Sequence, residues 1–185
     1  MIDEILLDAE ENMENALGVA RDNLASIRTG QASAAMFSHI AVDYYGAPTP
    51  LQQLASISIP EPRTVVIAPY DMSAKKDIDK ALRSSDLGIN PSDDGQVLRI
   101  NMPPMTEERR RDYVKLAKQR SEESRVTVRN MRRKAKDAID AAVKGGEVGE
   151  DEGSRAEKEL DALTKKYVDT IDAMLARKES ELLEV

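Results

Sequence analysis

The chain has 185 residues, of which 27 are basic and 34 are acidic, and its formal net charge of −7 argues against a general nucleic-acid binder. The absence of cysteine excludes disulfides and thiolate chemistry, and a single histidine, His39, leaves little for acid–base catalysis or zinc binding. The acidic N-terminus and the lack of an apolar run of about 18 residues predict a cytoplasmic protein without a signal peptide or membrane span.

The first predicted element is a helix over residues 2–28. Its apolar residues recur every three or four positions, which places them on one face of a helix. Thr29-Gly30 interrupts this pattern. We expect Gly30 to take the left-handed conformation that ends many helices.

The next 75 residues differ in character and predict a small α/β insert. All eight prolines of the chain lie here, six of them between residues 48 and 91. Runs typical of β-strands occur at 39–45, 56–59, 64–68 and 97–102, and residues 73–85 have the period of a short helix. The segment Asn90–Gly95 is rich in oxygen ligands but lacks the spacing of a calcium loop, so we expect an Asx-type turn there.

Two further long helices are predicted after the insert. One begins after Pro104 and ends at Gly145-Gly146, and the other carries an apolar stripe from Ala156 to Leu182. Helices of this length need an apolar face packed against a partner. The sequence therefore predicts an α+β protein: an antiparallel three-helix bundle formed by residues 1–29 and 105–185, with an α/β domain of residues 30–104 inserted between the first and second helices. The two connections, Thr29-Gly30-Gln31 and Met102-Pro103-Pro104, are expected to act as a hinge.

The second of the long helices is a basic segment in an acidic protein. Residues 106–146 contain 13 basic and 7 acidic residues, a net charge of +6. Stepping 100° per residue places a row of cations on one side of this helix, with Glu122 as the only acid among them, and places Tyr113, Ala117, Val128, Met131, Ala135, Ala138 and Ala142 on the core side. Solvated helix faces usually mix charges, because opposite charges at i and i+4 support the helix. An unpaired row of arginines therefore indicates an external anion, with an RNA backbone as the favoured partner and an acidic protein surface as the alternative.

The remaining signals are weak. His39 is interpreted as a structural or surface residue. Phe37, Tyr44, Tyr45 and Tyr70 could stack on bases, but a small domain with few aromatic residues is expected to use them in its core. Phosphate-binding loops and catalytic constellations are absent from the sequence, so we expect no enzyme activity, no metal and no cofactor.

Several motifs in order along the whole chain resemble the bacterial ribosome recycling factor family. They are Ile27-Arg28-Thr29-Gly30, Tyr44-Tyr45-Gly46 with Pro48-Thr49-Pro50-Leu51, Gln53-Leu54-Ala55, Ser85–Pro91, Leu98-Arg99-Ile100, Pro103–Arg110 and Val128–Arg133. The resemblance implies an L-shaped protein, monomeric and non-enzymatic. It implies a protein that binds the post-termination 70S ribosome through its bundle and, with elongation factor G and GTP, separates the subunits and releases mRNA and deacylated tRNA.

The resemblance also implies which residues meet the ribosomal RNA of the large subunit. The arginines that the family uses fall on Arg110, Arg129 and Arg132, with Arg133 beside them and Arg28 at a matching position near the expected hinge. Gln31 stands where the family usually has Arg. The basic row adds Lys118, Arg125 and Lys136 to the predicted RNA-binding set. From the residues alone, an RNA-binding regulator or a coiled-coil scaffold remain alternatives.

Overall fold

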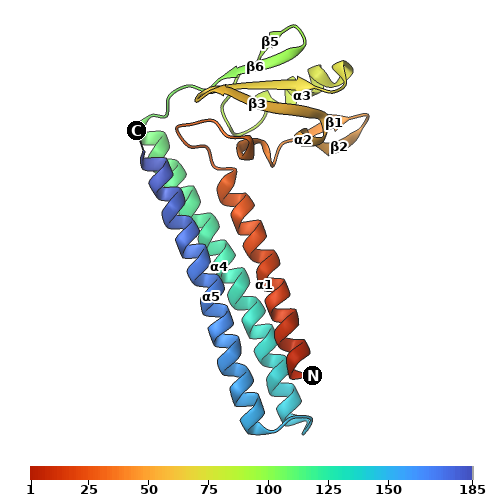
Figure 1. Cartoon of the computed structure of the whole chain (residues 1–185), viewed down its shortest axis with the longest axis vertical. Helices are drawn as coiled ribbons and strands as arrows, with labels where there is room; N and C mark the ends of the chain where they lie inside the picture. Colours follow the sequence, from red (N-terminus) through yellow and green to blue (C-terminus); the bar gives the residue numbers. More distant parts are fainter. Residues whose placement is uncertain (185) are drawn as a thin grey trace. The chain divides into compact units, whose positions relative to one another are not determined.

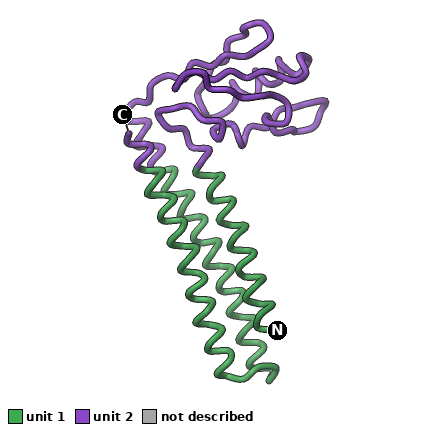
Figure 2. The backbone as a smooth tube through the Cα atoms, in the orientation of Figure 1, with its two compact units in different colours: residues 1–24, 115–179 green, residues 25–114, 180–185 purple. Residues whose placement is uncertain are grey.

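The computed structural model describes residues 1–184, which divide into two compact units (Figure 2). Of these residues, unit 1 comprises 1–24 and 115–179, and unit 2 comprises 25–114 and 180–184. No helix within residues 1–184 combines the length and the apolar character that a membrane crossing requires.

Unit 1 is a bundle built from three long helices that lie side by side (Figure 1). They are α1 (Ile2–Ala25), α4 (Glu107–Lys144) and α5 (Glu150–Leu183), and the ends of the last two continue into unit 2. The bundle predicted from periodicity is therefore confirmed. Its core contains Met13, Leu17, Val128, Ile139, Leu160, Tyr167 and Ile171, all nearly inaccessible to solvent.

The first helix ends three residues earlier than the sequence predicts. α1 stops at Ala25. Ile27 and Arg28 lie beyond the helix and are nevertheless buried. The apolar spacing of the helix therefore continues to Ile27, although the backbone there is not helical. Gly30 is not among the glycines with positive φ, and the left-handed cap expected there is wrong.

The turn between α4 and α5 forms as predicted. Gly146 has a φ of 74°, the left-handed region in which glycine carries no steric penalty. The amides of Gly146 and Glu147 donate to the carbonyls of Val143 and Ala142, each at 3.0 Å, and so satisfy the end of α4.

The core face of α4 is more polar than the sequence predicts. Ser121 and Ser124 are buried, and Ile139 takes a core position in place of Ala138, which is exposed. The hydroxyl of Ser124 donates to the carbonyl of Arg120, whereas that of Ser121 has no partner among residues 1–184.

Unit 2 contains a four-stranded antiparallel sheet of order β3-β4-β6-β5 and a two-stranded hairpin, β1-β2. The sheet strands are β3 (Ala55–Glu61), β4 (Thr64–Pro69), β5 (Ser92–Asp94) and β6 (Val97–Asn101), and the hairpin pairs β1 (Ala41–Tyr44) with β2 (Ala47–Pro50). The helices are α2 (Leu51–Leu54) and α3 (Lys75–Arg83), with 3₁₀ turns η1 (Ala34–Phe37) and η2 (Met72–Ala74). The hydrophobic core of this unit is inaccessible to solvent and contains Phe37, Leu51, Ile67, Ile78, Leu82, Leu98 and Ile100.

Most of the insert follows its sequence pattern. The helix expected at 73–85 is η2 followed by α3, and the strands expected at 39–45, 56–59, 64–68 and 97–102 form close to those positions. The predicted Asx turn is present, because the side chain of Asp93 accepts from the amide of Gly95 at 3.1 Å. Two strands were not predicted from the sequence. β2 contains two prolines, which strands tolerate at the edge of a sheet, and β5 is a short acidic strand.

The predicted burial of the aromatic residues is only partly correct. Phe37 is fully buried and Tyr44 is partly buried, with its hydroxyl donating to Asp71 at 2.9 Å. Tyr45 and Tyr70 are 81% and 71% exposed, and their assignment to the core is wrong. Tyr45 lies in the tight turn of the hairpin at a φ of 51°, outside the hydrophobic core of the unit. His39 is exposed, as expected for a surface residue.

Candidate nucleic-acid interface

The candidate interface lies on α4 within unit 1, where the cations of the predicted RNA-binding set divide into two groups. One group, Lys118, Arg125, Arg132 and Lys136, lies on the flank of α4 that faces α5 and contacts its acidic residues. The other, Arg129 and Arg133, forms no ion pair with α5 among the described residues. The two groups differ in how accessible their cations are.

Arg125 is the most enclosed member of the first group. Its Nη1 donates to Asp172 of α5 at 2.6 Å and its Nε to Glu122 of α4 at 3.0 Å, and the side chain is only 15% exposed. The hydrogen bond from Arg125, followed by one from Arg129, holds the pKa of the Glu122 carboxyl below its usual value. Arg125 therefore joins two helices as well as carrying charge.

The other flank residues also reach acids of α5. Arg132 contacts Asp161 at 2.6 Å, and Lys136 lies 3.9 Å from Glu157 while donating to Asp140 of its own helix at 2.8 Å. The bond to Asp140, with Glu157 further away, raises the pKa of Lys136. Lys118 lies 3.9 Å from Glu179. The expectation of an unpaired row facing outward is therefore wrong for these four residues, because their positions adjoin the α5 side of the core.

These acids lie on α5, so a helical wheel of α4 alone does not include them. A signal was nevertheless present in the spacing. Lys118, Arg125 and Arg132 are seven residues apart, and Asp172 and Glu179 repeat the same interval on the next helix. Charges repeated every seven residues on two antiparallel helices are typical of residues that flank a packed seam.

Arg129 and Arg133 are the cations that point away from the bundle. The side chain of Arg129 is 53% exposed, and its only ion pair with a described residue is a contact of 3.2 Å to Glu122, itself 54% exposed. Arg133 is exposed, and its side chain makes no hydrogen bond or ion pair with residues 1–184. Exposed ion pairs are worth about 1 kcal/mol or less, so an incoming phosphate can displace Glu122 at small cost.

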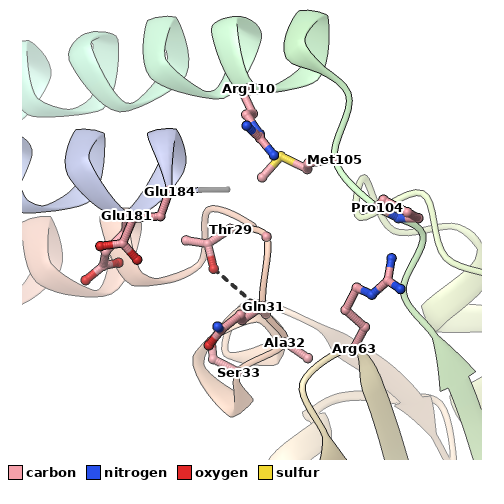
Figure 3. Close-up of a pocket in the computed structure, with 11 residues that line it drawn as sticks. Thr29, Gln31, Ala32, Ser33, Arg63, Pro104, Met105, Arg110, Glu181 and Glu184 are labelled. Carbon is pink, nitrogen blue, oxygen red and sulfur yellow. Dashed lines mark hydrogen bonds between the residues drawn. The ribbon is translucent and has the colours of Figure 1, made fainter.

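Arg110 belongs to unit 2 and lines a cavity of about 560 Å³ there (Figure 3). It is partly buried, and its Nε has no hydrogen-bond partner among residues 1–184. Figure 3 shows its side chain directed into the same space as Met105, with Glu181 and Glu184 on another wall. The Nε atom is itself inaccessible to solvent, so Arg110 can meet a ligand only through the part of its guanidinium that lines the cavity.

Arg28 has a different environment from the other predicted RNA-binding residues. It is 4% exposed, its Nη2 donates to the carbonyl of Pro103, and its Nε has no partner among the described residues. Burial lowers the pKa of its guanidinium, and the nearby charge of Arg109 adds to that effect. Arg28 therefore ties residue 28 to residue 103, and its buried guanidinium is not accessible in the way that the exposed arginines of α4 are.

The expected hinge residues all lie in unit 2. Met102 is buried in the core of that unit and its amide donates to the carbonyl of Arg63 at 2.7 Å, whereas the following Pro103 and Pro104 are exposed. On the other connection, the Thr29 hydroxyl donates to the carbonyl of Gln31 at 3.0 Å (Figure 3). Neither connection contains helix or strand, because β6 ends at Asn101, one residue before Met102.

The described residues contain no cluster of three or more His, Cys, Asp or Glu side chains able to hold a metal ion. What the site offers is exposed guanidinium groups on a rigid helix. Such groups bind phosphate oxygens through charge-assisted, often bidentate hydrogen bonds.

Comparison with known proteins decides the family. Residues 20–183 match the family model described as "Ribosome recycling factor". The chain belongs to the ribosome recycling factor family. Ribosome-recycling factors of Beutenbergia cavernae and Thermobifida fusca are 64% and 61% identical to it, each over the full length of both chains.

Solved structures agree with this assignment. A solution structure of the ribosome recycling factor is 41% identical, with a TM-score of 0.77 over 100% of this chain and 98% of the other. A second structure, 43% identical with a TM-score of 0.69 over all of both chains, describes the T. thermophilus ribosome recycling factor and the E. coli elongation factor G bound to the E. coli post-termination complex. The function of the protein is ribosome recycling, a step of protein biosynthesis, and its family is one of non-enzymatic translation factors. This excludes the coiled-coil scaffold and the RNA-binding regulator.

Proposed function

We propose that the protein binds ribosomal RNA of the large subunit through the outward face of α4, with Arg129, Arg132 and Arg133 as its principal contacts. The observation that carries this proposal is the exposure of Arg129 and Arg133, which have at most one exposed acid as partner. Lys118, Arg125 and Lys136 add positive potential while they hold α5. Arg110 contributes from unit 2 through the part of its guanidinium that lines the cavity there.

We further propose that, once bound to the post-termination 70S ribosome, the protein separates the subunits together with GTP-bound elongation factor G and so releases mRNA and deacylated tRNA. The support is the relative from T. thermophilus, which is described with elongation factor G on a post-termination complex. GTP hydrolysis belongs to elongation factor G, because the chain has no phosphate-binding loop motif. The protein would act as a monomer in the cytoplasm, where such ribosomes are found.

A hinge between a bundle of residues 1–29 and 105–185 and an insert of residues 30–104 is part of this proposal. Two irregular connections permit bending, and no regular backbone hydrogen bonds cross Pro103-Pro104. The bond from Arg28 to Pro103 ties the connections together, so that we expect them to bend as one.

The test is sedimentation of purified post-termination 70S complexes. With this protein, elongation factor G and GTP, we expect separate subunits; without elongation factor G, or with a non-hydrolysable GTP analogue, we expect intact 70S particles. Intact 70S particles in the complete mixture would contradict the proposal. So would GTP hydrolysis by the isolated protein.

Gly30→Pro tests the hinge in the same assay. Proline fixes φ and restricts the preceding residue. The amide of Gly30 makes no backbone hydrogen bond with residues 1–184, so the change stiffens this connection without removing a described contact. Its ideal Cβ would meet only the carbonyl of Glu184 at 3.9 Å. We expect large-subunit binding to persist and splitting to slow. Splitting at the wild-type rate would show that bending at Gly30 is not required.

A further inference from the structure

Asp161 of α5 occupies one edge of the Arg132 guanidinium. Its Oδ1 accepts from Nε at 2.6 Å and lies 2.6 Å from Nη2. Arg132 is 31% exposed and Asp161 is 52% exposed, so both groups can be reached from solvent. The pair lies at the surface of the bundle and is not part of its core.

The occupied edge is one that a phosphate would use. Guanidinium groups bind carboxylates and phosphates through the same pair of parallel N–H donors. While Asp161 holds Nε and Nη2, a phosphate oxygen can approach only the outer N–H groups, and it also meets the negative charge of the carboxylate. Asp161 and a phosphate are therefore competing partners for Arg132.

Arg125 and Asp172 show the same arrangement in a more enclosed form. Arg125 is 15% exposed and is also held by Glu122, so RNA gains less by displacing its acid. Arg129 has no acid of α5 against it. Arg132 is thus the residue at which competition between the two partners has the largest effect.

We propose that Asp161 is a positioning residue that limits the affinity of the RNA interface by holding the Nε–Nη2 edge of Arg132. This inference rests on the proposed function, because it assumes that Arg132 meets RNA phosphate. An internal competitor lowers affinity without removing the cation. That property suits a factor that must leave the ribosome in every cycle.

The test compares Asp161→Asn with the wild type in binding to purified large ribosomal subunits over a salt series. We expect the variant to bind about two- to fivefold more tightly, the worth of one exposed ion pair. We also expect a steeper dependence on salt, by up to about 0.7–0.9 in the log–log slope, because one more cation is available to phosphate. A purely structural role for Asp161 would not change that slope.

Two matched variants separate this mechanism from simple loss of negative charge. Glu159→Gln removes the same charge from an exposed position of α5 that has no ion pair with a described residue, and it should change affinity less. In an Arg132→Gln background, Asp161→Asn should have no further effect. Equal gains from Glu159→Gln, or a gain that persists without Arg132, would overturn the inference.

Arg129→Glu in the same assay shows which proposal fails. If Arg129→Glu weakens binding but Asp161→Asn does not strengthen it, the inference about Asp161 is wrong and the RNA interface stands. If Arg129→Glu binds as the wild type does, the RNA interface and the inference fall together.

Discussion

At the scale of single residues, Tyr167 of α5 is 2% exposed and donates a hydrogen bond of 2.7 Å to Glu14 of α1. Burial, followed by the bond to Glu14, raises the pKa of this tyrosine from 10 to about 12. The folded protein therefore favours the neutral phenol. The stabilisation is complete below pH 10 and is lost as the pH rises toward 12, because the unfolded chain releases this proton first.

Tyr167→Phe measures this contribution. The free energy of unfolding of the wild type is expected to fall by about 1.4 kcal/mol per pH unit more steeply than that of the variant between pH 10 and pH 12. Urea unfolding of both proteins at a series of pH values provides the comparison, in which the other tyrosines cancel. Parallel pH profiles would contradict the assigned role of the Tyr167–Glu14 bond.

Single residues were the hardest feature to predict from the sequence. Arg28 follows the first helix and was expected to meet RNA, but it is buried, and its partner, the carbonyl of Pro103, lies 75 residues away in the chain. Tyr45 was expected in the core and is exposed in a tight turn. Both outcomes depend on tertiary contacts that residue type and local spacing do not determine.

At the scale of elements, Gly153 fixes the approach of α5 to α4 beside the turn that joins them. A Cβ at this position would lie 2.4 Å from Cγ2 of Val143, a β-branched side chain with little freedom to move. The glycine thus permits a helix contact that any larger residue would push apart.

Gly153→Ala is expected to lower the free energy of unfolding by about 1 kcal/mol, since overpacking of roughly 1–3 kcal/mol exceeds the helix-propensity gain of about 1 kcal/mol. In a Val143→Ala background the clash is absent, and the same substitution should stabilise the protein. Urea unfolding of the wild type, the two single variants and the double variant measures both effects. A stabilising effect of Gly153→Ala in both backgrounds would refute the close contact.

Long helices were predictable because their apolar residues repeat over many turns. In the stripe from Ala156 to Leu182, most of the residues are buried as expected, and Leu163, Met174 and Leu175 are partly buried. Short elements were harder to predict. β2 and β5 have three or four residues and contain prolines or aspartates, which strands usually avoid. The α4–α5 ion pairs required the register of two helices, and a helical wheel of α4 alone cannot supply it.

At the scale of the whole molecule, the net charge of −7 does not reveal how the charges are distributed. The protein is acidic overall, but α4 carries exposed cations that face outward. Composition alone suggested no nucleic-acid partner, and the basic row alone left RNA and acidic proteins open. The motifs along the full chain resolved the family, which the comparisons confirm. The predicted domain boundaries near residues 29 and 104 and the RNA contacts remain predictions.

The most direct test of the central claim is the affinity of Arg129→Glu for large ribosomal subunits. Loss of a charge-assisted phosphate contact costs about 1.5–3 kcal/mol, so we expect roughly ten- to a hundredfold weaker binding. The matched control is Lys134→Glu, an exposed residue about 140° around α4 from Arg129, and it should bind nearly as the wild type does. Circular dichroism should show both variants folded. Equal affinities for the two variants, or wild-type binding that does not weaken with salt, would contradict an RNA interface on α4.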